Sequence, residues 1–234
     1  MSAAPPLEEV RWDEARRIIS SRYPPIDLFE DIADPRDWDL LASAEAKTNP
    51  RMAEHVGQLD LVPPERRVSG PGASHVMAPF VHVSPDRPGR FHDGTFGAYY
   101  AANRFDTAVA ETAYHKGIFY GATEEAPGWF SQMRELVGSV DARLHDLRRS
   151  DAYGDCLDPD RYVVSQSLAR QLRASGSNGL VYPSVRDPAG ECLAAFWPDV
   201  IGVPVQGRHL AYHFDGQVID LVRDESSGDV WRLG

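Results

Sequence analysis

Short stretches typical of strands and of helices are mixed along this chain without the regular alternation of a doubly wound parallel sheet. Runs rich in β-branched and aromatic residues predict strands, and apolar residues three and four positions apart predict helices. The predicted strands are 11–20, 76–83, 96–102, 129–140, 142–147, 180–184, 192–197, 209–214 and 217–222. The predicted helices are 34–48, 106–117 and 158–175. This mixture favours an α+β fold with a mixed sheet and flanking helices.

The clearest boundaries come from glycine, proline and aspartate. Asp158 and Pro159 are typical of a helix start, and Gly176 is typical of its end. Asp215–Gly216 separates two alternating runs, which predicts a β-hairpin.

Two further features concern the first half of the chain. Asp34–Pro35 predicts another helix start. Residues 62–74 contain three prolines and two glycines and are predicted to be a loop. Pro79 interrupts 76–83, so this strand is expected at a sheet edge or at a bulge.

Composition limits the classes of function. The 234 residues suit one domain over 1–234, and the net charge of −11 argues against direct binding of nucleic acid. Cys156 and Cys192 lack a zinc-type spacing and are expected to be reduced thiols. The N-terminus has no signal-peptide pattern, and no apolar run is long enough to span a membrane. We therefore expect a soluble, cytoplasmic protein.

The densest group of chemically active residues lies between Gly89 and His115. Arg90 stands in a glycine-flanked loop, Tyr100 ends a predicted strand, and Glu111 falls on the following helix among alanines. A carboxylate in apolar surroundings is expected to face a cleft or pair with a cation, because burying it alone is costly. The alternative is that the three are a surface, a core and an exposed helix residue.

A second stretch runs from Gly179 to Phe196. Here Ser184 and Arg186 follow a predicted strand, where they would be placed to hold a phosphate or a ribose hydroxyl. The alternative is a turn in which Ser184 satisfies backbone groups.

Other ligand sites have less support. The chain has no glycine-rich dinucleotide or P-loop motif. Glu111 and His115 are one helical turn apart, but no third ligand has a suitable spacing, so no metal is expected and His115 is interpreted as an orienting or structural residue.

Both stretches resemble the RES domain, which is named for its Arg, Glu and Ser. The resemblance is carried by Gly-Arg-Phe, Phe-Gly-x-Tyr-Tyr-Ala-Ala and Ala-Glu-Thr-x-Tyr-His in the first stretch and by Gly-Leu-Val-Tyr-Pro-Ser-Val-Arg in the second. The segments 21–29 and 48–51 also resemble longer RES proteins. The similarity extends from about residue 16 to 222, although the region of about 24–75 is longer than in compact members.

The resemblance implies a fold similar to ADP-ribosyltransferases of the diphtheria-toxin type and a cleft that binds NAD⁺ as substrate. It implies that the catalytic residues are Arg90, Tyr100, Glu111 and Ser184. Arg90, Tyr100 and Ser184, together with Arg22 and Tyr23, would then contact NAD⁺. It also implies a toxin that depletes NAD⁺ by hydrolysis or phosphorolysis and is neutralised by a cognate Xre-type antitoxin.

The same residues allow two alternatives. One is a mono-ADP-ribosyltransferase that modifies a cellular protein, and the other is an inactive binding module with the same fold. In the enzymatic cases Glu111 is expected to stabilise the positive charge that develops on ribose. Arg90 would hold phosphate oxygens, Tyr100 would stack on nicotinamide, and Ser184 would bind the carboxamide or a ribose hydroxyl.

Overall fold

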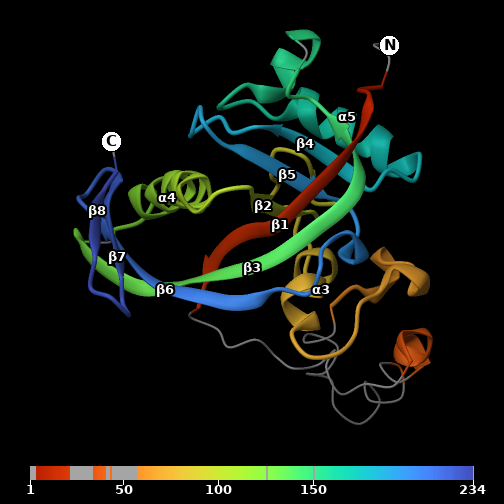
Figure 1. Cartoon of the computed structure of the whole chain (residues 1–234), viewed down its shortest axis with the longest axis horizontal. Helices are drawn as coiled ribbons and strands as arrows, with labels where there is room; N and C mark the ends of the chain where they lie inside the picture. The colour runs from red at the N-terminus through yellow and green to blue at the C-terminus, as the bar shows by residue number, and fades with distance from the viewer. Residues whose placement is uncertain are drawn as a thin grey trace.

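The chain forms a mixed β-sheet flanked by helices, as Figure 1 shows for the computed structural model. The structure describes residues 4–21, 34–40, 43, 57–124, 126–149 and 151–233. Its strands are β1 Leu7–Ser20, β2 Tyr99–Ala102, β3 Gly128–Asp146, β4 Gly179–Pro183, β5 Glu191–Ala195, β6 Val205–Phe214, β7 Ile219–Asp224 and β8 Val230–Arg232. Its α-helices are α3 Ala73–Val81, α4 Phe105–Gly121 and α5 Val163–Ala174. Its 3-10 helices are η1 Pro35–Asp37, η2 Leu59–Leu61, η3 Pro64–Arg66, η4 Asp151–Leu157 and η5 Pro198–Val200. The predicted α+β class is confirmed.

The long strand β3 connects the two halves of the sheet. Along one edge it pairs with β1, from His145 opposite Leu7 to Met133 opposite Ser20. Along its other edge it pairs with β6 at its start and, in parallel, with β4 at its end. Since β1 also meets β2, the strands β1, β2, β5, β4 and β3 form a closed ring, from which β6, β7 and β8 extend. The two strands predicted over 129–147 are thus one continuous strand.

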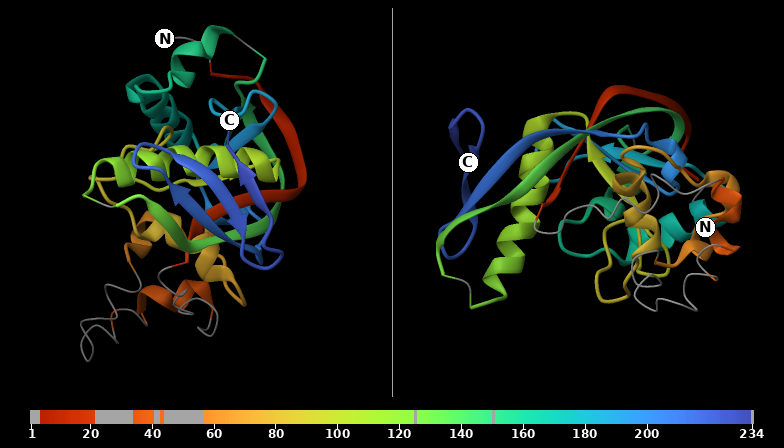
Figure 2. Two further views of the ribbon diagram at one scale, coloured as in Figure 1. Left: turned by 90° about the vertical axis from the view of Figure 1, so that its left-hand side faces the viewer. Right: turned by 90° about the horizontal axis from the view of Figure 1, so that it is seen from below.

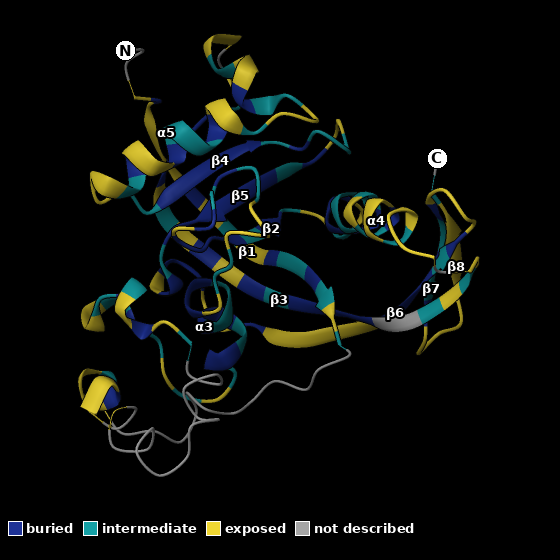
Figure 3. Ribbon diagram, turned by 180° about the vertical axis from the view of Figure 1, so that it is seen from behind, coloured by how far each residue is buried: buried dark blue, intermediate teal, exposed yellow. Residues whose placement is uncertain are grey.

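Strands β4 and β5 separate two hydrophobic cores, and Figure 3 shows both strands as almost wholly buried. Leu180 and Ala194 belong to the core shared with α4 and α5, whereas Val181 and Leu193 belong to the core shared with α3. Successive side chains of a strand point to opposite faces. Burial on both faces therefore explains why 180–182 and 192–196 are nearly continuous apolar runs.

Residues 76–83, predicted to be a strand, mostly form α3 instead. Val76, Met77, Phe80 and Val81 are all buried, so the segment lacks the polar face that would reveal a helical period. Pro79 lies inside this helix, where it has no amide hydrogen to donate to the carbonyl four residues earlier. The predicted loop of 62–74 contains η3 and the first two residues of α3.

Two predicted helix starts are partly correct. Asp158 accepts hydrogen bonds from the amides of Asp160 and Arg161, at 2.9 and 2.8 Å, but it caps a turn and α5 begins only at Val163. Asp34 accepts from the amide of Arg36 at 3.0 Å and precedes η1, as the sequence predicts. Much of the remaining predicted helix lies outside the described residues.

The C-terminal hairpin is confirmed. The Asp215 amide donates to the Val218 carbonyl at 3.1 Å, and Gly216 adopts a φ of 107°, which glycine accommodates without strain. Gly176, with a φ of 82°, follows the end of α5 as predicted. Among the described residues, no helix combines the length and apolar character that crossing a bilayer requires.

Candidate active-site cleft

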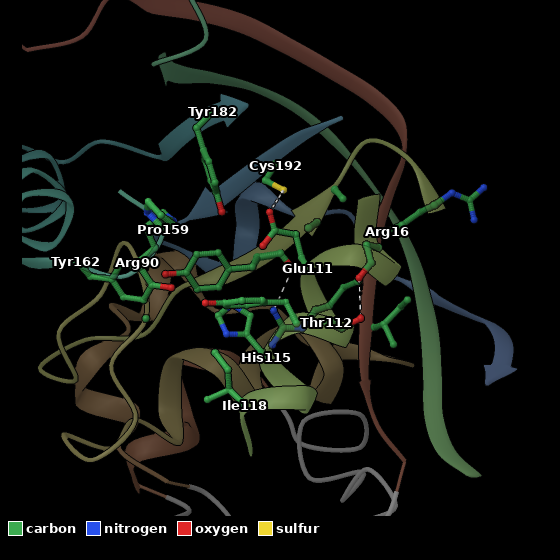
Figure 4. A pocket seen from close by; sticks show the side chains of 18 of the residues that line it. Arg16, Arg90, Glu111, Thr112, His115, Ile118, Pro159, Tyr162, Tyr182 and Cys192 are labelled. Carbon is green, nitrogen blue, oxygen red and sulfur yellow. Dashed lines mark hydrogen bonds between the residues drawn. The ribbon is translucent and has the colours of Figure 1, made fainter. Parts of the chain in front are cut away.

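A cleft with a volume of about 590 Å³ lies beside α4. β1 and β2 contribute to its wall, as do the loop before β2 and the segment before α5. Figure 4 shows Glu111 and His115 projecting from α4, with Arg90 and Tyr162 on the other side of the view. Of the predicted catalytic residues, Arg90, Tyr100 and Glu111 line this cleft.

Glu111 is held through one of its two carboxylate oxygens. The hydroxyl of Ser184 donates to Oε1 at 2.6 Å, and the thiol of Cys192 contacts the same oxygen at 3.8 Å. Among the described residues, Oε2 has no hydrogen-bond partner. The carboxylate is therefore oriented by two side chains and keeps one oxygen available to a ligand.

Ser184 is fixed by the loop that follows β4. Its Oγ accepts hydrogen bonds from the amides of Arg186 and Asp187, at 3.2 and 3.0 Å, so its own proton is directed to Glu111. The residue is only 8% exposed and does not line the cleft. It thus adjoins the site behind Glu111, where it can orient the carboxylate.

Cys192 on β5 was not predicted to belong to the site. Burial, followed by the charge of Glu111, raises the pKa of its thiol well above the ordinary value. The thiol is therefore protonated at neutral pH and can act as a weak donor to Glu111. Both Cys156 and Cys192 are free, as expected, and both are buried.

Arg90 joins the loop before β2 to the segment before α5. Its Nη1 donates to the carbonyls of Cys156 and Asp158, at 3.3 and 2.5 Å. Its guanidinium lies 4.6 Å from the centre of the Tyr162 ring. These contacts restrain the side chain, while Nε and Nη2 have no hydrogen-bond partner among the described residues. Arg90 is consequently pre-positioned for an anionic ligand.

Tyr100 is fixed at both its hydroxyl and its backbone. Its hydroxyl accepts from the amide of Phe91 at 2.8 Å, and its carbonyl accepts from Arg17 at 3.0 Å. Burial raises the pKa of the phenol, so the ring is neutral at physiological pH. Tyr100 is thus a fixed, uncharged aromatic residue of the cleft wall.

Two arginines of β1 also line the cleft, and the sequence interpretation assigned them no role. Arg17 lies 4.6 Å from the centre of the Tyr99 ring, and burial lowers its pKa. Arg16 forms ion pairs with Glu135, which is buried, and with Glu14. Two consecutive arginines directly before the apolar pair Ile18–Ile19 were the available signal.

Arg22 and Tyr23, predicted to contact NAD⁺, lie outside the described residues. Tyr162 carried no recognisable sequence signal, because its place in the cleft depends on the turn before α5. Within the described ranges, no three His, Cys, Asp or Glu side chains form a group that could hold a metal ion.

The fold and the cleft define an α+β protein in which an oriented carboxylate faces arginines and tyrosines. The RES domain family model matches residues 64–215, and the chain belongs to the RES family. It is 30% identical over 211 residues to protein y4oC of Sinorhizobium fredii, covering 90% of this chain and 86% of that protein. A chain in the crystal structure of the M. tuberculosis MbcT–MbcA toxin–antitoxin complex has a TM-score of 0.45 and 12% identity, covering 90% of this chain and 87% of that chain.

Proposed function

We propose that this RES protein cleaves the bond between nicotinamide and ribose in NAD⁺. The observation that carries the proposal is the state of Glu111, which lies in the cleft, is anchored through Oε1 and has no partner at Oε2 among the residues that the structure describes. The cleft volume of about 590 Å³ is in the range of small-molecule sites. Arg16, Arg17 and Arg90 line the cleft, and because Arg16 is paired with two glutamates, it is Arg17 and Arg90 that would suit the negatively charged pyrophosphate.

The chemistry needs charge stabilisation more than proton donation. Nicotinamide leaves from a pyridinium, so it departs as a neutral molecule without being protonated. Positive charge then develops on the ribose, and a fixed carboxylate next to the sugar lowers the energy of that state. Glu111 would supply this carboxylate, and Oε2 could also accept a hydrogen bond from a ribose hydroxyl.

The remaining side chains would hold the dinucleotide. Arg90 keeps donors available beyond its two carbonyl contacts, and Tyr100 offers a neutral aromatic surface on which nicotinamide could stack. Ser184 would act through Glu111, because its hydroxyl is already bound there.

The biological role proposed is that of a toxin that depletes NAD⁺ and is neutralised by an Xre-type antitoxin. This part rests on membership of the RES family. Transfer of ADP-ribose to a protein uses the same first step and differs only in the acceptor. Mass spectrometry separates the two products: free ADP-ribose or its phosphate indicates degradation, whereas a modified protein indicates transfer.

The direct test compares purified wild type with Glu111→Gln in an NAD⁺ consumption assay. We expect Glu111→Gln to lower kcat/KM by at least about 10²-fold, because removing one preorganised stabilising group typically has an effect of this size. Glu124→Gln, which changes an exposed carboxylate just after α4, is the matched control. Circular dichroism verifies that both variants are folded. Wild-type NAD⁺ turnover by folded Glu111→Gln would refute the proposal.

A further inference from the structure

His115 is a titratable side chain of the cleft for which the bond-cleaving step has no use. It lies on α4 one turn after Glu111, on the same helix face, and both line the cleft. Among the described residues, neither of its ring nitrogens has a hydrogen-bond partner. A ring with both nitrogens uncommitted beside the expected position of the ribose can exchange a proton with a reactant.

We propose that His115 is the general base that accepts the proton of the nucleophile that captures the ribosyl cation. The proposal rests on the NAD⁺ cleavage proposed above and specifies its second substrate. This second substrate is then a neutral compound with a hydroxyl group, which is water when NAD⁺ is degraded. An anion such as phosphate carries its own negative charge and would not need this base.

The charged groups around His115 come from three parts of the chain. Glu111 precedes it on α4, Arg186 follows β4, and Arg90 precedes β2. Arg186 is held in place, since it donates to the Pro159 carbonyl at 2.9 Å and lies 3.3 Å from the centre of the Tyr114 ring. Asp160 and Tyr162 complete the titratable side chains on the α5 side of the cleft.

Although the residue as a whole is exposed, partial desolvation by the cleft, together with the two arginines, lowers the pKa of His115, and Glu111 only partly opposes this. The imidazole is therefore neutral at pH 7, the form in which it can accept a proton.

Glu111 is poorly suited to take this proton itself. Its negative charge is what stabilises the ribosyl cation, and protonation would remove that charge while the cation still exists. A separate base lets Glu111 stay ionised throughout the reaction. Two titratable groups with different environments and different roles are a common arrangement in enzymes.

The bond from ribose C1′ to nicotinamide breaks, and its electron pair leaves with nicotinamide. A lone pair of the water oxygen forms the new bond to C1′, and one water proton moves to a ring nitrogen of His115. The imidazolium then releases this proton to solvent, which restores the neutral ring for the next turnover.

The test measures NAD⁺ hydrolysis by wild type, His115→Gln and His115→Asn between pH 5 and 8. We expect the kcat of wild type to decrease as the pH falls below the pKa of His115, which is lower than 6.5. At pH 7 the kcat of both variants should be about 10²-fold lower than that of wild type. This is the lower end of the usual effect of a general base, because cleavage of the C–N bond does not need the base. Both variants should also lack this acidic decline. His209→Gln on β6 is the matched control and should behave as wild type.

Azide provides the second measurement, because it is a nucleophile with no proton to lose. Azide should restore turnover in His115→Gln and form 1-azido-ADP-ribose, but it should not rescue Glu111→Gln. A His115→Gln enzyme with wild-type kcat and pH profile, or without azide rescue, would overturn the role of His115 alone. Wild type that consumes no NAD⁺, or an active Glu111→Gln, would overturn the proposed function and this inference with it.

Discussion

Ser184 contacts Glu111, whereas the sequence interpretation expected it to contact the ligand. A serine after a strand can bind a phosphate, a ribose hydroxyl or nearby backbone amides, and sequence alone does not distinguish these uses. In the structure its oxygen accepts from two amides and its proton goes to Glu111. The two amide contacts match the turn alternative, and the contact with Glu111 leads us to interpret Ser184 as a positioning residue of the proposed site.

Ser184→Ala should therefore reduce kcat with little effect on KM. We expect a decrease of about 10-fold, since the carboxylate remains but loses a charge-assisted hydrogen bond worth about 1.5–3 kcal/mol at most. Steady-state kinetics with NAD⁺ measure both constants, and Ser184→Thr should recover most of the activity. A large rise in KM with unchanged kcat would instead show that Ser184 binds the ligand directly.

The sequence predicts that some other residues belong to the cleft but gives no sign that others do. Arg90, Tyr100 and Glu111 share one short stretch of chain, and the loop–strand–helix order predicts that they converge. Tyr162 and Cys192 reach the cleft from distant segments. Their contribution depends on the register between β2 and β5 and on the turn before α5, which no local pattern encodes.

At the scale of elements, strand β4 begins at a position that only glycine tolerates. Gly179 has a φ of 141°, and a Cβ added there would lie 2.2 Å from the Ala194 carbonyl oxygen on the neighbouring strand β5. Both strands support the site, because β4 leads to Ser184 and β5 carries Cys192. A side chain at this position should separate the two strands.

We accordingly expect Gly179→Ala to lower the free energy of unfolding by more than about 1 kcal/mol, because both the backbone conformation and the contact are unfavourable. Urea unfolding followed by circular dichroism measures the change. Gly154→Ala is the control, since an added Cβ there meets no heavy atom within 4 Å. Equal stability of the two variants would show that the strands can move apart without cost.

Sequence patterns predicted those elements that have one buried and one exposed face, or a definite turn. The hairpin at Asp215–Gly216 and the amphipathic helix α5 are examples. Helix α3 was misread because it is buried on nearly every side, which removes the periodicity that separates helices from strands. The start of α5 was placed too early because Asp158 caps a turn whose carbonyls are bound by Arg90.

At the scale of the whole molecule, folding lowers the pKa of titratable groups in separate parts of the fold. Partial desolvation lowers the pKa of the half-buried His92 and of His115 in the cleft, so the unfolded chain takes up protons at these histidines at a higher pH than the folded chain does. For Asp146, burial alone would raise the pKa, but hydrogen bonds and charge from Arg148 outweigh it and lower the pKa below 3.8. The two types of group affect stability in different pH ranges.

The free energy of unfolding should therefore fall in two stages as the pH decreases. The first stage begins near the ordinary histidine value of 6.5, because protons stabilise the unfolded state until the lower folded pKa is reached. The second begins near 3.8, where Asp146 becomes protonated in the unfolded chain and its bond to Arg148 starts to favour folding less. Urea midpoints from pH 8 to pH 3 measure both stages. His92→Gln should reduce the first and leave the second, and a stability that increased from pH 7 to pH 5 would contradict the lowered pKa of these histidines.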